Sequence, residues 1–413
     1  MPCLAASAVQ QLITDAHVPG LSMAVIDDRQ ATALTVVGVR NSLYRAAVDQ
    51  QTIFGAASLS KPLFAYAVLQ LVDAGKLAFD TPLSLHVPDY VADDPRAAAV
   101  TVRHVLSHTS GLPNWRSVDL PLKTYFPPGK RFSYSGEGFV WLQRVVEAVT
   151  GESLNTTLRR LIFEPLGMHR SSYTWQSAFE ANYADPHEAE MTPGAKTKPS
   201  VPNVAASLQT TGDDFARFLE AVLSGARLRR DTARLWFEPQ VHLHDMEIAW
   251  GLGWGLETKS GTFFQWGDDD RGRFKAFAMG SMQQRCATVV LTNGFHGMAI
   301  MPELIGKRAE FNAFDVLLAA PATTLPGILA KLATFKTLRS AMYGCSMTAR
   351  AAQPCCWKVL RHPSRTSRRC CHEQKTHDAL GIALRVARPR KSNPAGWPYG
   401  FRHQVHGGRQ GYR

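Results

Sequence analysis

A hydroxyl and an amine lie three residues apart in the segment Ser58-Leu59-Ser60-Lys61. Residues i and i+3 share one face of an α-helix, so the side chains of Ser58 and Lys61 would point into the same small volume. A serine hydroxyl becomes a good nucleophile when a neighbouring group takes its proton, and a desolvated lysine that is neutral near pH 7 can do this. The same four letters occur on many exposed helix faces, so the prediction of a nucleophilic serine depends on its context.

The residues after Lys61 supply that context. Pro62 suits a first helical turn, and apolar residues then recur at the helical period until Gly75 stops the pattern. Ser58 is therefore expected at a helix N-terminus, where free N–H groups and the positive end of the helix dipole favour developing negative charge.

Two later segments contain polar groups at the ends of regular elements. Tyr134-Ser135-Gly136 opens an apolar helical run, and Gln265-Trp266-Gly267 follows a strand-like stretch. Each is weak evidence alone, because a loop tyrosine is often structural and a Trp-Gly pair often closes a strand. The two segments become informative because they follow the Ser58 segment in a particular order along the chain.

In this order the three segments resemble the motifs of serine hydrolases related to class C β-lactamases, penicillin-binding peptidases and their esterase relatives. That family has S-x-x-K, then Y-x-N, then Lys or His, any residue and Gly. The resemblance runs from about Val18 to about Leu318. Three more segments agree with the family pattern: Thr101–Pro113, which contains H-T-S-G-L-P, Phe163–Met168 and Val290–Gly294.

The resemblance implies an acyl transfer reaction on an ester, amide or lactam. Ser58 would attack the carbonyl, Lys61 or Tyr134 as phenolate would move the proton, and backbone N–H groups of Ser58 and Asp268 would hold the oxyanion. No metal or other cofactor is implied, and the partner is a small-molecule, short peptide or ester substrate. The alternative is a binding or sensor protein on the same fold that is non-catalytic or is acylated without turnover. The expected substrate-binding residues are Gln265, Trp266, Gly267 and Asp268.

Two positions depart from the family pattern. Gln265 stands where relatives place Lys or His, and a charge about 5 Å away is worth roughly 3 kcal/mol at an effective dielectric near 20. Deprotonating Lys61 or Tyr134 should then be harder, and substrates anchored by a carboxylate lose their counter-charge unless Arg271, Arg273 or Lys275 replaces it. Gly136 stands where relatives place Asn, a loss for which Glu137 could compensate. The missing cation favours neutral esters or amides over β-lactams and peptides with a free carboxylate.

Charge divides the chain into two parts. Residues 1–320 contain 29 Lys and Arg against 32 Asp and Glu, whereas residues 321–413 contain 17 against 2. The basic character therefore belongs to the tail, and no nucleic acid is expected as a partner of the body. The tail, rich in Arg and Cys, is expected to be disordered; it would be an appendage, a polyanion-binding segment or a cysteine-based metal site, and we favour the appendage.

Residue patterns predict an α/β (α+β) fold. Strand patterns occur near both ends of residues 1–320 and helices between them, which predicts an antiparallel sheet flanked by helices with an inserted, mostly helical lobe, as in β-lactamases and transpeptidases. The sheet lobe is expected at about 1–81 and 206–320 and the helical lobe at about 82–205. The pattern predicts one strand over Trp250–Glu257.

Targeting signals are weak. The first residues lack the apolar core of a signal peptide, which favours the cytoplasm, although a wrongly assigned start site would hide a leader and make the protein exported. No run long enough to span a bilayer is visible, and the oligomeric state is open. His104 and His108 have the spacing of a zinc pair, but we favour a packing role because no third ligand is apparent. Asp185 and His187 are expected to face water in a loop.

Overall fold

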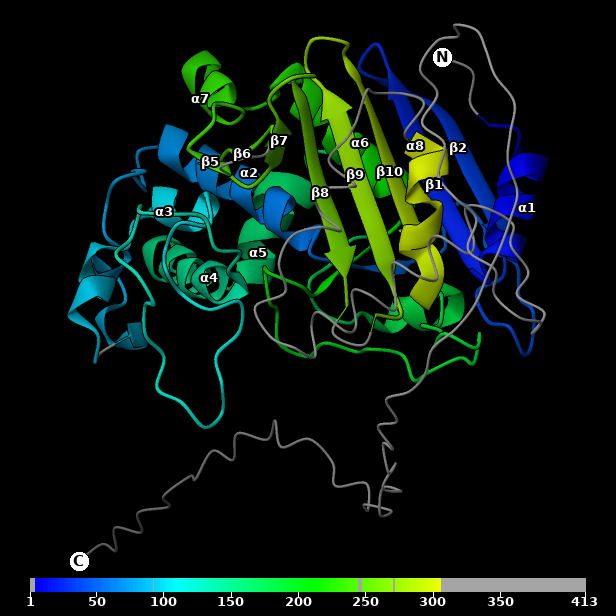
Figure 1. Cartoon of the computed structure of the whole chain (residues 1–413), viewed down its shortest axis with the longest axis horizontal. Coiled ribbons are helices and arrows are strands. Elements are labelled where there is room, and N and C mark those ends of the chain that lie inside the picture. The colour runs from blue at the N-terminus through cyan, green and yellow to red at the C-terminus, as the bar shows by residue number, and fades with distance from the viewer. Residues whose placement is uncertain (1–3, 92, 244–246, 270–271, 306–413) are drawn as a thin grey trace, which may run out of the picture. The chain divides into compact units, whose positions relative to one another are not determined.

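The sheet that organises the molecule joins distant parts of the chain. The computed structural model describes residues 4–91, 93–243, 247–269 and 272–305, and among these it contains an eight-stranded antiparallel sheet of order β2-β1-β10-β9-β8-β7-β6-β5. Strands β1 and β10 come from opposite ends of the described chain and pair directly, with Leu21 opposite Thr292 (Figure 1). The predicted antiparallel sheet flanked by helices is confirmed.

Two short strands outside this sheet, β3 and β4, pair with each other. Of the described elements, the strands are β1 (Gly20–Asp27), β2 (Gln30–Gly38), β3 (Phe54–Ala57), β4 (Leu208–Thr210), β5 (Val241–Leu243), β6 (Ile248–Trp250), β7 (Gly255–Glu257), β8 (Thr262–Asp268), β9 (Lys275–Ser281) and β10 (Cys286–Thr292). The α-helices are α1 (Ala6–Asp15), α2 (Ser60–Asp73), α3 (Val102–Leu106), α4 (Gly136–Thr150), α5 (Leu154–Leu158), α6 (Gly212–Ser224), α7 (Arg230–Leu235) and α8 (Met301–Ile305).

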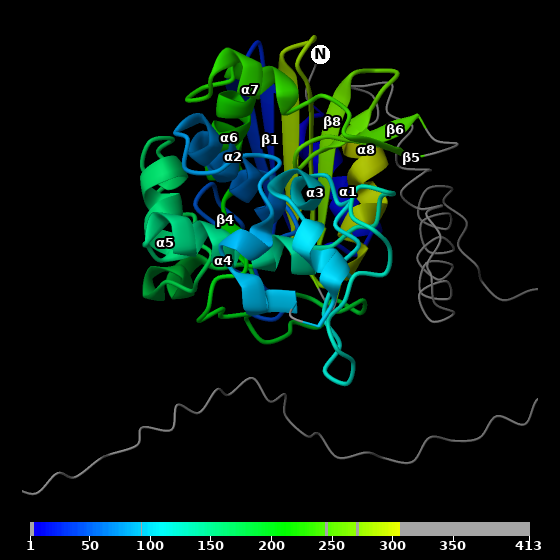
Figure 2. The same ribbon diagram turned by 90° about the vertical axis from the view of Figure 1, so that its left-hand side faces the viewer.

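The alternation of side chains along β1 produces two apolar layers. Leu21 and Met23 pack in the layer that contains α1 and α8, whereas Ala24 and Ile26 pack in the layer that contains α2 and α6. Successive side chains of a strand point to opposite faces, so one apolar strand serves both layers. Figure 2 shows the sheet nearly edge-on between these two groups of helices.

Helix α2 lies at the centre of the larger layer. Its residues from Ser60 to Leu71 are all buried, so the helix has no solvent-facing stripe. Such a helix is apolar on every side, and a lysine within it must find internal partners. The helix ends at Asp73, and Gly75 adopts a left-handed φ of 69°, as the sequence pattern predicts.

The expected strand over Trp250–Glu257 is wrong, because β6 and β7 are separated by a turn in which Gly253 has a φ of 99°. Among the described residues, the named elements between Asp73 and Leu208 are all helical. The predicted tail, residues 321–413, lies outside the described residues. No helix in the described part of the chain is long and apolar enough to cross a membrane.

Candidate active site

Ser58 lies in the turn between β3 and α2, and its hydroxyl is aligned with a buried amine. Ala57 has a φ of 46°, which turns the chain sharply out of the strand just before Ser58. Lys61 is 1% exposed, and its Nζ donates to Ser58 Oγ at 3.0 Å and to the carbonyl oxygen of Ala205 at 2.7 Å. The i, i+3 spacing has thus brought hydroxyl and amine into hydrogen-bond contact.

The turn that presents Ser58 is fixed by the next serine. Ser60 Oγ donates to the carbonyl oxygen of Ala57 at 2.5 Å and accepts from the backbone N–H of Leu208 at 3.0 Å. One hydroxyl therefore ties the end of β3, the first turn of α2 and β4 together. A nucleophile held in this way loses little orientational freedom when a substrate binds.

Tyr134 reaches the same place from the start of α4. Its ring centroid lies 4.7 Å from Lys61 Nζ, and its hydroxyl contacts Ser58 and accepts from Gln265 Nε2 at 3.0 Å. Burial raises the pKa of Tyr134 above its ordinary value, while the hydrogen bonds with Ser58 and Gln265 oppose the rise. The phenol is therefore protonated at neutral pH.

The remaining predicted positions lie along β8. Strand β7 pairs with β8 only as far as Phe264, so the following half of β8 extends past β7 towards Tyr134. Gln265 is fully buried and its Oε1 has no hydrogen-bond partner among the described atoms. Trp266 stacks on the Tyr134 ring at 5.5 Å between centroids.

Gly267 determines how closely β8 approaches β3, whereas the Asp268 side chain has its partner on β9. A Cβ on Gly267 would collide with the carbonyl oxygen of Ala56, so only glycine lets β8 approach β3 this closely. The Asp268 side chain points away from this contact and pairs with Lys275 across the strands, with 2.6 Å between Lys275 Nζ and Asp268 Oδ1.

His108 packs against Tyr134, in line with the packing role that the sequence predicts. Its ring stacks on Tyr134 at 4.2 Å between centroids, and its Nδ1 accepts from the backbone N–H of Ser135 at 3.0 Å. Burial and the nearby Lys61 charge hold the pKa of His108 well below its ordinary value, so the ring is neutral. His108 opens the H-T-S-G-L-P segment, so its place in that segment is the sequence signal for a position beside Tyr134.

His104 and His108 have separate backbone partners. His104 lies in the capping box of α3, where its Nδ1 accepts from the N–H of Thr101 at 3.3 Å. Among the described residues, no three side chains of His, Cys, Asp or Glu are grouped to hold a metal ion.

The charged residues that could replace the cation missing at Gln265 and the amide missing at Gly136 have other partners. Lys275 pairs with Asp268, and Arg273 lies 3.8 Å from Glu188. Glu137 accepts from Arg116 Nε at 2.9 Å and from the Tyr90 hydroxyl, so it serves the loop before α4 and not Lys61. Arg271 lies outside the described residues.

The expectation that Asp185 and His187 face water is wrong. The Asp185 carboxylate is buried and accepts from Asn41 Nδ2 and from the Tyr44 hydroxyl, each at 2.7 Å. His187 is fully buried and its Nε2 accepts from the N–H of Ser42 at 3.1 Å. These residues anchor the segment that follows β2.

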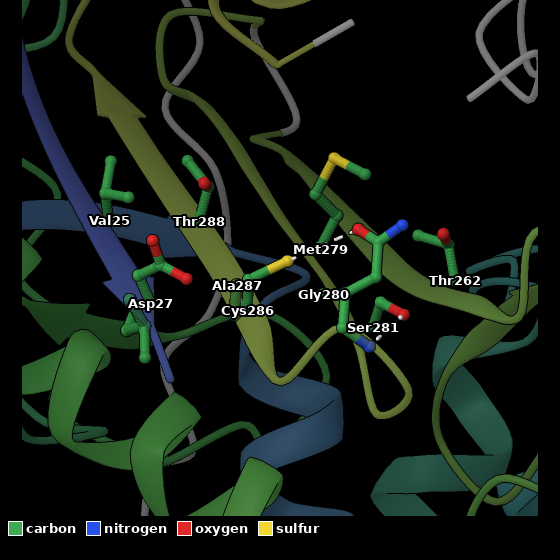
Figure 3. Close-up of a pocket in the computed structure, with 11 residues that line it drawn as sticks. Val25, Asp27, Thr262, Met279, Gly280, Ser281, Cys286, Ala287 and Thr288 are labelled. Carbon is green, nitrogen blue, oxygen red and sulfur yellow. Dashed lines mark hydrogen bonds between the residues drawn. The ribbon is translucent and has the colours of Figure 1, made fainter. Parts of the chain in front are cut away.

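A cavity of about 140 Å³ occurs away from Ser58, towards the ends of β1, β8, β9 and β10 (Figure 3). Met279, Cys286 and Thr288 are among the side chains around it. None of the predicted site residues lines this cavity, so it is separate from the cluster around Lys61.

Comparison with known proteins identifies the family of the chain. The family model described as Beta-lactamase matches residues 5–313. Penicillin-binding protein 4 of Amycolatopsis lactamdurans is 29% identical over 361 residues, covering 78% of this chain and 94% of the relative. Esterase EstB of Burkholderia gladioli is 31% identical over 276 residues, covering 50% of this chain and 66% of the esterase.

Two solved structures share the fold. The octameric penicillin-binding protein homologue from Pyrococcus abyssi has a TM-score of 0.64 at 22% identity, over 76% of this chain and 80% of that one. A mutant class C β-lactamase has a TM-score of 0.62 at 19% identity, over 73% of this chain and 95% of that one. Because the family model spans most of the chain and the folds agree, this protein belongs to the β-lactamase family of serine hydrolases, which act on ester, amide or lactam bonds.

Proposed function

We propose that Ser58 is the nucleophile of this hydrolase and that Lys61 is its general base. The observation that carries the proposal is the 3.0 Å contact between Lys61 Nζ and Ser58 Oγ, made by an amine that is 1% exposed. Ser58 Oγ attacks the substrate carbonyl, and its proton passes to Lys61. The site then returns this proton to the alcohol or amine, which leaves. Water then attacks the acyl-enzyme and releases the acid.

Tyr134 carries the proton between Ser58 and the leaving group. Its hydroxyl contacts Ser58, and its raised pKa keeps the phenol protonated, which suits a donor better than a base. The backbone N–H groups of Ser58 and Asp268 stabilise the tetrahedral oxyanion, because fixed donors contribute most where charge develops. The close approach of Gly267 to β3 supports this pairing of β8 with the Ser58 turn.

Neutral esters or amides are the proposed substrates. Gln265 offers an amide where relatives have a cation, and the nearby Lys275 and Arg273 lie against carboxylates. A substrate carboxylate would therefore lose its hydration without gaining a full counter-charge, which is unfavourable. The names of the relatives include both an esterase and penicillin-binding proteins, and the missing cation favours the esterase side.

Active-site labelling tests the assignment. A fluorophosphonate should label the wild type and should not label Ser58→Ala. Turnover of p-nitrophenyl acetate should exceed turnover of nitrocefin. Persistent labelling of Ser58→Ala would contradict the nucleophile, and faster nitrocefin turnover would contradict the substrate preference. A stoichiometric burst without steady turnover would favour the sensor.

A further inference from the structure

Trp115 is a partly exposed aromatic residue beside the buried amine. Its ring centroid lies 6.0 Å from Lys61 Nζ, which also faces the rings of Tyr134 at 4.7 Å and Phe139 at 5.9 Å. Phe139 is fully buried, whereas Trp115 is 38% exposed. Trp115 is thus the ring of this group that both approaches Lys61 and presents a large surface to incoming molecules.

The loop that carries Trp115 is fixed on both sides to the first turn of α4. Asn114 Oδ1 accepts from the N–H of Gly136 at 3.0 Å, and the carbonyl oxygen of Asn114 accepts from the N–H of Glu137 at 2.9 Å. Arg116 then pairs with the buried Glu137 carboxylate, with Nη2 and Oε1 2.5 Å apart. The indole is therefore held in place, as a wall residue of a binding site must be.

Gly136 makes room for this indole. A Cβ added to Gly136 would lie 2.8 Å from Cη2 of Trp115 and 3.0 Å from the carbonyl oxygen of Asn114, closer than side chains normally approach. A side chain at position 136 and the Trp115 indole in its present position exclude each other. The glycine that replaces the Asn of the Y-x-N pattern and the position of Trp115 are therefore linked.

We propose that Trp115, admitted by Gly136, is the specificity-determining residue that binds the apolar acyl chain of a neutral ester. This inference rests on the proposed acyl transfer at Ser58. The bond between the acyl group and Ser58 forms in the first step and is broken by water in the second, so the acyl group lies beside Lys61 in both steps and the wall nearest Lys61 contacts its chain. An indole face offers apolar contact and no counter-charge, which selects longer uncharged acyl chains over short or anionic ones.

The test compares kcat and KM for p-nitrophenyl acetate and p-nitrophenyl octanoate. In Trp115→Ala the ratio of kcat/KM for octanoate to that for acetate should fall about tenfold, mainly through KM. Trp115→Phe should keep most of the preference. Val118→Ala is the matched control, because Val118 lies in the same loop, is 97% exposed and should leave the ratio unchanged.

Gly136→Ala provides an independent test. Its added methyl group should displace the indole and lower the octanoate preference to the level of Trp115→Ala, and the double variant should lose no more than Trp115→Ala alone. Thermal denaturation and fluorophosphonate labelling of Ser58 accompany each variant. If Trp115→Ala or Gly136→Ala folds and is labelled at Ser58 but keeps the octanoate preference, the role of Trp115 is wrong. The proposed acyl transfer at Ser58 is unaffected by that result. A wild type that neither labels nor hydrolyses either ester overturns the proposed function and this inference with it.

Discussion

At the scale of single residues, Gln265 is the unusual member of the site. Its Nε2 donates to the Tyr134 hydroxyl and opposes the effect of burial on the pKa of that phenol, but an amide carries no net charge. A neutral donor stabilises the phenolate less than a cation does. This explains how the site can keep a proton on Tyr134 at neutral pH while holding its oxygen in place.

Gln265→Met should test this role, because methionine has a similar volume and no donor. Loss of one hydrogen bond, worth about 1 kcal/mol, should lower kcat/KM for p-nitrophenyl acetate several-fold, because the Tyr134 hydroxyl loses the donor that holds it in place. Gln265→His keeps a donor and should retain more activity. A folded Gln265→Met variant with unchanged kcat/KM would refute the role.

At the scale of elements, the site depends on the distance between β8 and β3. Gly267 allows the two strands to approach, and both the Ser58 turn and the Gln265 end of β8 take their positions from that contact. Small displacements of reacting groups have large effects on rate, of the order of 100-fold for about 1 Å.

Gly267→Ala should therefore lower kcat/KM about 100-fold while costing about 1–3 kcal/mol of stability, because the new methyl group meets the Ala56 carbonyl. Gly261→Ala is the matched control at the other end of β8: its φ of 65° makes it strained, but a Cβ there meets nothing within 4 Å. We expect Gly261→Ala to lose stability and keep activity. Equal kinetic losses in both variants, measured with the same ester, would show that the contact has no special role.

At the scale of the whole molecule, buried phenols set the alkaline limit of stability. Burial raises the pKa of Tyr66 from 10.0 to about 12, and it also raises the pKa values of Tyr90, Tyr173 and Tyr183. Each phenol stays protonated in the folded state after it has ionised in the unfolded state. Their contribution is therefore fully present below pH 10 and is lost as the pH rises through the folded pKa values.

The free energy of unfolding should accordingly fall above pH 10, and Tyr66 alone should account for roughly 2–3 kcal/mol of the loss between pH 10 and 12. Urea unfolding at a series of pH values measures this. Tyr66→Phe retains the ring that stacks on Trp236 and removes the ionisation, so its stability should fall less steeply in this range. Parallel curves for the two proteins would contradict the assignment to Tyr66.

Local sequence patterns were enough to predict the features that depend only on residues close together in the chain. The i, i+3 spacing of Ser58 and Lys61 and the helix up to Gly75 follow from backbone geometry, and the structure has both. The break between β6 and β7 escaped prediction because a turn glycine within a continuous apolar run leaves the hydrophobic pattern unchanged.

Contacts between distant segments required the folded chain. Tyr134 and Gln265 are separated by 131 positions, and only the sheet and α4 together bring the phenol to the amide. The same holds for the partners of Glu137 and for the indole of Trp115 over Gly136, because a side chain's neighbours across the chain depend on packing and not on spacing. Residue order thus specifies which groups are available for chemistry, and packing specifies which of them meet.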